Sequence, residues 1–181
     1  IKSGEILETM GKVDTMAFDK TGTLTRGQLA VQSILAVDTD YSETDILQLA
    51  ASAEAKSEHP IGKAIVSHAI EQDLEILDTT SFTMSVGKGI IAVIKGRELY
   101  CGNERFLEEH NIIVNESIQQ TVNVYRSEGK VSVIIADKEH IIGIITLSDI
   151  MRNDAINMIS AISSLDMTTV LLTGDSKAAA T

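Results

Sequence analysis

A short polar segment of the chain has residue types that suit phosphoryl chemistry. The apolar run 13–18 predicts a buried strand, and residues 19–25, DKTGTLT, follow it as a turn. Asp19 is therefore expected at the carboxyl end of a strand, where open α/β sheets place their ligands. A carboxylate there can attack phosphorus and form an aspartyl phosphate, while Lys20, hydroxyl groups and turn amides hold phosphate oxygens. The segment predicts covalent phosphoryl transfer with Asp19 as the nucleophile.

A second group of residues could hold a flat base. Residues 57–62, SEHPIG, place His59 directly before Pro60, which suits the first turn of a helix. An imidazole at a helix mouth can stack on a purine or form a hydrogen bond with its edge. Further along, Gly87 and Gly89 lack Cβ atoms and let the backbone approach a base or a phosphate. Each feature alone is common in ordinary caps and turns, so their combination carries the prediction.

Apolar periodicity predicts the elements that must position these residues. Helices are expected to begin at Ser42 and Pro60 and to occupy 103–110, 116–128 and about 152–165; strands are expected over 28–37, 90–94, 98–101, 131–136, 141–147 and 168–172. The strand 168–172 ends in a second polar turn, TGD. Polar turns of similar type, DKTGTLT and TGD, therefore lie before and after a stretch rich in hairpins. Residues 33–143 are predicted to form a separate domain that is inserted between 1–32 and 144–181.

Composition limits the classes of function that the chain can have. The 181 residues carry a net charge of −11 with no basic cluster, which argues against nucleic-acid binding. Cys101 is the one cysteine, so no internal disulfide can form, and a small core residue is expected there. The sequence contains no Cys-x-x-Cys or His-x-x-x-His pair and therefore predicts no metal-binding module of its own. Its apolar runs are far shorter than the roughly 20 residues that span a bilayer.

DKTGTLT resembles the phosphorylation signature of P-type ATPases, within the haloacid-dehalogenase-like superfamily. SEHPIG is similar to the Ser-Glu-His-Pro signature in the nucleotide-binding domain of heavy-metal (type IB) members. The resemblance spans essentially all of the chain and implies an α/β fold. A haloacid-dehalogenase-like Rossmann phosphorylation domain, incomplete here, is interrupted by an inserted α+β nucleotide-binding domain with an antiparallel sheet. Most phosphatases of the superfamily carry an acid/base Asp where this chain has Thr21, so hydrolysis of the acyl phosphate should be slow.

The resemblance also implies the residues of the site. The implied catalytic residues are Asp19, Lys20, Thr21, Thr173, Gly174 and Asp175. The residues implied to line the ATP pocket are Glu54, His59, Gly87, Gly89, Ile90 and Asn103. The implied ligands of Mg²⁺ are Asp19 and the backbone carbonyl of Thr21. Asp149 and Arg152 resemble an Asp-x-x-Arg stretch of the family, but they equally fit a helix start with an exposed Arg. Lys88 is expected to be solvated rather than a phosphate ligand.

The implied function is the ATP-binding and phosphorylation region of a heavy-metal P-type ATPase, in which ATP phosphorylates Asp19 to drive ion transport. The expected partners are ATP and the actuator and transmembrane parts of the same pump, with the transported metal ion bound outside these residues. The expected location is the cytosolic side of the cell membrane. The chain is expected to be a piece of such a pump with little turnover of its own. Two alternatives stay open: a soluble haloacid-dehalogenase-like phosphatase, and a nucleotide-binding module without turnover.

Overall fold

The chain forms two compact units. One unit joins residues 1–28 to 149–181, and the other contains residues 29–148. The structure is a computed structural model that describes residues 4, 8, 11–165 and 167–172. Because the larger unit is one continuous stretch, the chain leaves the smaller unit once and returns to it once. The assignment of separate functional domains to residues 1–32, 33–143 and 144–181 stays a prediction.

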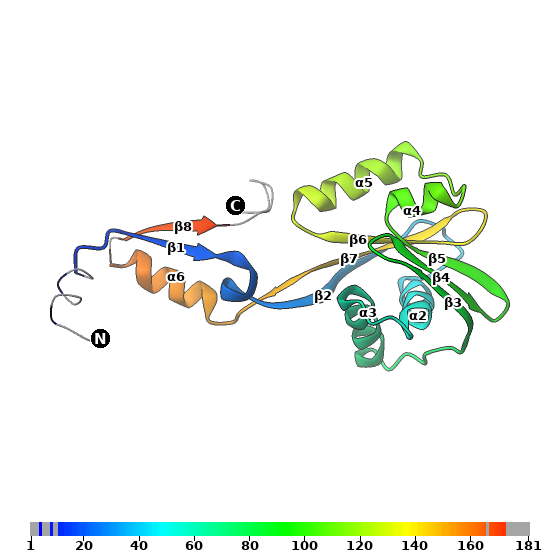
Figure 1. The fold of residues 1–181 in the computed structure, drawn as a ribbon, viewed down its shortest axis with the longest axis horizontal. Coiled ribbons are helices and arrows are strands. Elements are labelled where there is room, and N and C mark those ends of the chain that lie inside the picture. The colour runs from blue at the N-terminus through cyan, green and yellow to red at the C-terminus, as the bar shows by residue number, and fades with distance from the viewer. Residues whose placement is uncertain (1–3, 5–7, 9–10, 166, 173–181) are drawn as a thin grey trace. The chain divides into compact units, whose positions relative to one another are not determined.

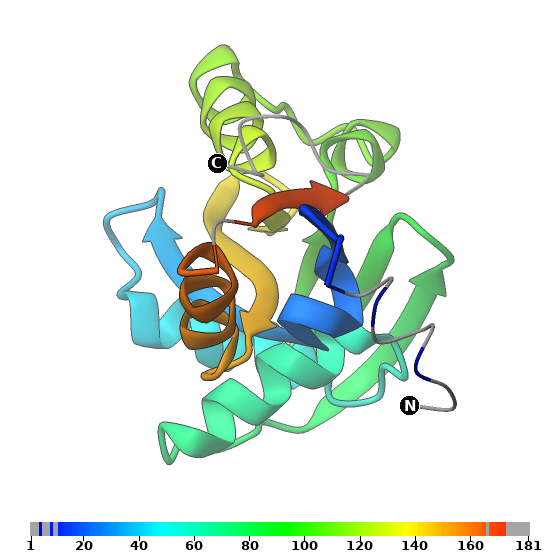
Figure 2. The same ribbon diagram turned by 90° about the vertical axis from the view of Figure 1, so that its left-hand side faces the viewer.

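The smaller unit is built on two parallel strands. β1 (Thr15–Asp19) pairs with β8 (Thr168–Leu172) so that Asp19 lies opposite Leu172 (Figures 1 and 2). A one-turn π-helix, η1 (Lys20–Leu24), follows β1, and α6 (Ala155–Ser163) precedes β8. The prediction that the strand before Asp19 is buried was wrong for the described residues. Their side chains alternate between exposed and half-buried, because β8 is the one strand beside β1 in that part of the chain.

The larger unit contains an open sheet. Among the described residues the sheet has the strand order β2-β7-β6-β5-β4-β3. The strands are β2 (Thr25–Ala36), β3 (Thr79–Ser85), β4 (Gly89–Ile94), β5 (Arg97–Gly102), β6 (Val131–Ala136) and β7 (Ile141–Met151). The pairs from β7 to β3 are all antiparallel. This sheet confirms the expected α+β insertion.

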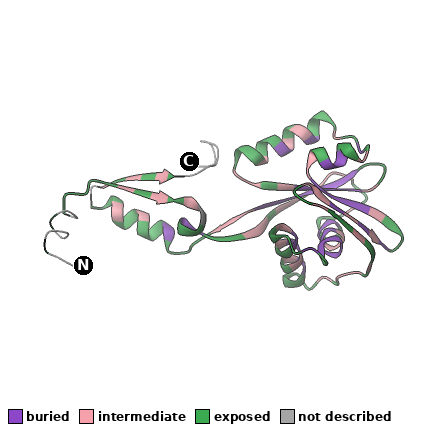
Figure 3. Cartoon of the chain, viewed as in Figure 1, coloured by how far each residue is buried: buried purple, intermediate pink, exposed green. Residues whose placement is uncertain are grey.

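Helices cover both faces of this sheet (Figures 1 and 3). The helices are α2 (Glu43–Glu54), α3 (Pro60–Glu71), α4 (Glu104–Glu109) and α5 (Glu116–Ser127). The predicted apolar stripe of α2 is buried at Ile46 and Ala50, which pack with Ile65 of α3 on one face. Phe106 of α4 belongs to a second apolar cluster together with Ile144 of β7. Successive residues of the central strands face opposite clusters, so each strand is apolar on both sides.

The segment around Asp149 differs from the predicted helix start. β7 continues to Met151, and α6 begins at Ala155. The amide of Arg152 donates to the carbonyl of Leu24, with a distance of 2.9 Å between nitrogen and oxygen. The amide of Arg152 thus binds a residue more than a hundred positions away in the sequence. Helical periodicity reports only on nearby residues, so it could not show where β7 ends.

β4 and β5 approach each other closely at two glycines. A Cβ atom built on Gly89 would lie 2.5 Å from the carbonyl oxygen of Cys101 and 2.6 Å from Cδ1 of Phe106. A Cβ atom on Gly102 would also lie 2.6 Å from that ring carbon. Gly87, in the turn before β4, has open space around it but a φ of +72°. Gly89 is therefore required by packing, and Gly87 by the conformation of the turn.

We expect Gly89→Ala to lower the free energy of unfolding by about 1–3 kcal/mol, because the added methyl group overpacks the core at Phe106. Gly87→Ala adds no clash, so it should cost about 1–2 kcal/mol from the left-handed backbone alone. Urea denaturation would give both values. Chemical shifts of the Phe106 ring should move in Gly89→Ala and stay unchanged in Gly87→Ala. A Gly89→Ala variant with wild-type stability and wild-type ring shifts would contradict the packing explanation.

Candidate functional site

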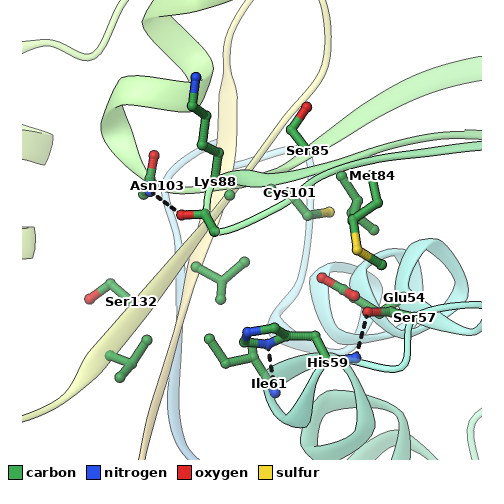
Figure 4. A pocket seen from close by; sticks show the side chains of 16 residues that line it. Glu54, Ser57, His59, Ile61, Met84, Ser85, Lys88, Cys101, Asn103 and Ser132 are labelled. Carbon is green, nitrogen blue, oxygen red and sulfur yellow. Dashed lines mark hydrogen bonds between the residues drawn. The ribbon is translucent and has the colours of Figure 1, made fainter.

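A cavity of about 340 Å³ opens in the larger unit (Figure 4). Its volume lies within the range of small-molecule sites. The cavity brings together all six residues that were predicted for the ATP pocket, namely Glu54, His59, Gly87, Gly89, Ile90 and Asn103. They come from the end of α2, from the α2–α3 connection, from β4 and the turn before it, and from the start of α4. Their roles in binding stay predictions, but segments far apart in the sequence do meet around one space.

His59 caps helix α3 and faces this cavity. Its Nδ1 accepts a hydrogen bond from the amide of Ile61 at 3.3 Å, and its own amide donates to Oγ of Ser57 at 3.3 Å. Because Nδ1 is the acceptor, the proton of the neutral imidazole lies on Nε2. Pro60 at the first helical position removes an amide that would have no partner within the helix. The imidazole is therefore held at the N-terminus of α3, and its Nε2 proton can be donated to a ligand.

Glu54 is a buried carboxylate at the end of α2. Only 6% of the residue is exposed, and burial raises the pKa of its carboxyl group, while a hydrogen bond with Ser57 partly offsets this shift. A Cβ atom on Gly62 would lie 2.5 Å from Oε2 of Glu54 and 2.9 Å from Oγ of Ser57. The missing side chain of Gly62 makes the room for the carboxylate. Sequence reasoning missed this role, although Gly62 belongs to the SEHPIG segment.

Asn103 fixes the glycine turn on the other side of the cavity. Its Oδ1 accepts from the amide of Phe106 at 2.9 Å, and its Nδ2 donates to the carbonyl of Gly87 at 3.4 Å. The backbone amide of Asn103 also donates to the carbonyl of Lys88 at 3.0 Å. Asn103 thus caps α4 and fixes the turn, which is a structural role in addition to any contact with a ligand.

Several further residues line the cavity that the sequence did not mark as pocket residues, among them Met84, Ser132 and Cys101. Cys101 is buried, as predicted for a core residue, and burial raises the pKa of its thiol. Among the described residues that line the cavity, Glu54 is the one carboxylate and Lys88 the one Lys or Arg side chain.

In the smaller unit, Asp19 is exposed at the end of β1, and the turn that follows it is held by Thr25. The amide of Gly22 donates to Oγ1 of Thr25 at 3.1 Å, and that hydroxyl donates to Oδ2 of Asp149 at 2.5 Å. The other carboxylate oxygen of Asp149 accepts from the amide of Gln28 at 2.9 Å. Thr25 is 1% exposed, so its own bonds are partly shielded from water, whereas the bond from the Gln28 amide is exposed. Asp149 therefore fixes the shape of the motif from the far side of the insertion.

The second half of the predicted catalytic set, Thr173, Gly174 and Asp175, lies outside the described residues. Leu172, which precedes it, is paired with Asp19 in the strand register. The described residues contain no group of three or more His, Cys, Asp or Glu side chains that could hold a metal ion. No helix in that part of the chain is long and apolar enough to cross a membrane. The Mg²⁺ roles of Asp19 and Thr21 stay predictions.

Comparisons with known proteins extend these observations. A family model described as haloacid dehalogenase-like hydrolase matches residues 13–181. Over 175 residues the chain is 38% identical to a copper-exporting P-type ATPase of Staphylococcus epidermidis, covering 96% of this chain and 21% of the relative. The crystal structure of a zinc-transporting PIB-type ATPase in its E2.Pi state aligns with a TM-score of 0.86 and 36% identity, over 99% of this chain and 29% of that one. The catalytic domain of the CPx-ATPase CopB-B aligns with a TM-score of 0.68 and 25% identity, over 98% and 60%.

The chain spans about a fifth of the length of the relative from Staphylococcus epidermidis. The matches confirm the predicted fold class and the predicted resemblance to heavy-metal P-type ATPases. The chain belongs to the haloacid dehalogenase-like hydrolase family, and its relatives there are heavy-metal P-type ATPases.

Proposed function

We propose that this chain is the ATP-binding and phosphorylation region of a heavy-metal P-type ATPase. The observation that carries the proposal is that all six predicted pocket residues line the same cavity, in a chain that also places DKTGTLT at the end of β1. A soluble phosphatase fits less well, because Thr21 stands where such enzymes carry their acid/base Asp. One of the relatives described above exports copper and another transports zinc, which supports a heavy-metal pump in general.

The cavity offers the contacts that adenine needs. Ile61, Ile90 and Met84 supply apolar surface for the faces of the base. The ionised carboxylate of Glu54 can accept a hydrogen bond from the exocyclic amino group of adenine, and guanine has an oxygen acceptor at that position instead. The Nε2 proton of His59 can be donated to a ring nitrogen, or the imidazole can stack on the base. The pocket therefore favours adenine over guanine.

The proposed reaction is transfer of the γ-phosphoryl group of ATP to Asp19. A carboxylate oxygen of Asp19 attacks the γ-phosphorus, the bond from that phosphorus to the ADP oxygen breaks, and an aspartyl phosphate forms with ADP as the leaving group. Lys20, together with Thr173, Gly174 and Asp175, is proposed to hold and neutralise the transferring group. Asp149 acts indirectly, because it fixes the turn through Thr25.

Mg²⁺ is the proposed cofactor. The carboxylate of Asp19 and the backbone carbonyl of Thr21 are hard oxygen donors, which fit an ion that is usually held by one or two carboxylates together with substrate phosphates and water. When bound, the ion supplies positive charge next to the phosphate oxygens. Further proposed partners are the actuator and transmembrane parts of the same pump, with the transported ion bound outside this chain. The region is proposed to lie on the cytosolic side of the cell membrane.

We expect His59→Ala to weaken ATP binding by about 1–2 kcal/mol, a factor of roughly 5–30, because one stacking or hydrogen-bonding contact is lost. Isothermal titration calorimetry on the whole chain would measure the change. His68→Ala, on the same helix but away from the cavity lining, is the matched control and should bind ATP like the wild type. Unchanged affinity in a folded His59→Ala protein would contradict the assignment of the pocket.

Glu54 should make stability depend on pH. Because burial raises its folded-state pKa above the ordinary value of 4.5, the ionised form is disfavoured in the folded protein. Stability should therefore be lost as pH rises above about 4.5 and through the folded-state pKa, and the penalty is absent at lower pH. Glu54→Gln should be more stable than the wild type at pH 7 and equally stable near pH 4, by urea denaturation. Equal stability of the two proteins at both values would contradict a buried carboxylate at this position.

Asp19→Asn should abolish the phosphoenzyme in the full-length protein that contains this chain, because an amide cannot act as the nucleophile. ATP binding should persist, since the proposed pocket lies in the other unit. The measurement is acid-stable, hydroxylamine-labile labelling from γ-labelled ATP. Asp14→Asn, just before β1, is the control and should still be labelled. Labelling of Asp19→Asn at a different residue would overturn the mechanism.

A further inference from the structure

The only Lys or Arg side chain among the described cavity residues does not point at the space where adenine is proposed to lie. Lys88 stands between Gly87 and Gly89 in the turn before β4. Figure 4 shows its side chain extending away from His59 and Glu54. Its Nζ donates to both carboxylate oxygens of Glu109, at 2.8 Å and 2.7 Å. Lys88 therefore has a carboxylate partner, which the sequence did not indicate, although its side chain stays in contact with water.

Glu109 has a second cationic partner. Nε of Arg105, one helical turn earlier on α4, donates to Oε1 of Glu109 at 3.1 Å. The hydrogen bonds from Lys88 are the largest cause of the lowered pKa of the Glu109 carboxyl, so this carboxylate is ionised at neutral pH. The Lys88 and Glu109 side chains are 38% and 40% exposed. An ion pair in contact with water is weak, and a more highly charged anion can displace the carboxylate.

The backbone holds Lys88 at the rim of the cavity. Its amide donates to the carbonyl of Ser85 at 3.0 Å, and its carbonyl accepts from the amide of Asn103 at 3.0 Å. Because both backbone groups are fixed, the ammonium group can change partner by rotation of the side chain alone. The protein carries a net charge of −11, which repels phosphate. A cation at the rim of the cavity would offset this repulsion locally.

We infer that Lys88 binds the diphosphate part of the nucleotide and that Glu109 competes with the nucleotide for it. This inference rests on the proposed function of the cavity. Without nucleotide, Lys88 is paired with Glu109. When a nucleoside di- or triphosphate binds, the Lys88 ammonium leaves Glu109 for the phosphate oxygens, and Glu109 remains with Arg105. Adenosine needs no such exchange, so Lys88 and Glu109 together set how strongly the pocket prefers phosphorylated ligands.

Calorimetric titration of the whole chain with adenosine and with Mg²⁺-free ADP, at low ionic strength, tests this exchange. Lys88→Met should lower ADP affinity about tenfold, the loss of one charge-assisted hydrogen bond, and leave adenosine affinity unchanged. Glu109→Gln should raise ADP affinity about threefold, because the competing charge is gone. In the double variant, ADP should bind as in Lys88→Met alone, since Glu109 acts through Lys88.

Lys138→Met is the matched control. Lys138 pairs with Glu98 at 3.2 Å in the same unit and lies outside the cavity lining, and its substitution changes the net charge equally. It should leave ADP affinity unchanged. Equal losses of ADP affinity in Lys88→Met and Lys138→Met, or an ADP affinity in Glu109→Gln at or below that of the wild type, would overturn the inference. Failure of the wild type to bind adenosine would instead refute the proposed function of the cavity.

Discussion

The hydrogen bonds of one carboxylate hold together the two places where the chain leaves and re-enters its smaller unit. Asp149, on β7, accepts from the hydroxyl of Thr25 and the amide of Gln28, both on β2. Thr25 in turn accepts from the amide of Gly22, within the DKTGTLT motif. The turn after Asp19 therefore depends on a residue from the other side of the insertion. A large domain can interrupt the smaller unit because this contact joins the two segments of the unit.

The pocket of the larger unit is built by glycines that serve the protein as much as a ligand. Gly62 leaves room for the carboxylate of Glu54, and Gly89 lets β4 approach β5 against the ring of Phe106. A loss of nucleotide binding on substitution of either glycine would therefore reflect a changed pocket wall as well as a lost contact. Glu54 itself is held where burial disfavours its charge. Such a cost is typical of groups that are kept for function rather than for stability.

Local sequence patterns predicted much of this molecule, because they report on neighbours along the chain. Helix starts were predicted correctly at Ser42 and at the proline that opens α3, and the motifs indicated residues that line one cavity. What could not be predicted depends on partners that only the fold brings together. The ion pair of Lys88 with Glu109 joins a turn to a helix, and the bond from Asp149 to Thr25 crosses the whole insertion. No periodicity or motif spacing encodes such pairs.

The parallel pairing of β1 with β8 has a consequence for the order of folding during synthesis. Thr15 lies opposite Thr168, whereas residues 29–148 form a continuous stretch with its own core. On the ribosome the inserted unit can complete its contacts before β8 exists, while β1 must wait for its partner. A folded insertion also shortens the effective loop that this pairing has to close, which lowers the entropic cost. Mutations that slow folding of the insertion should therefore delay assembly of the strand pair that presents Asp19, without touching either strand.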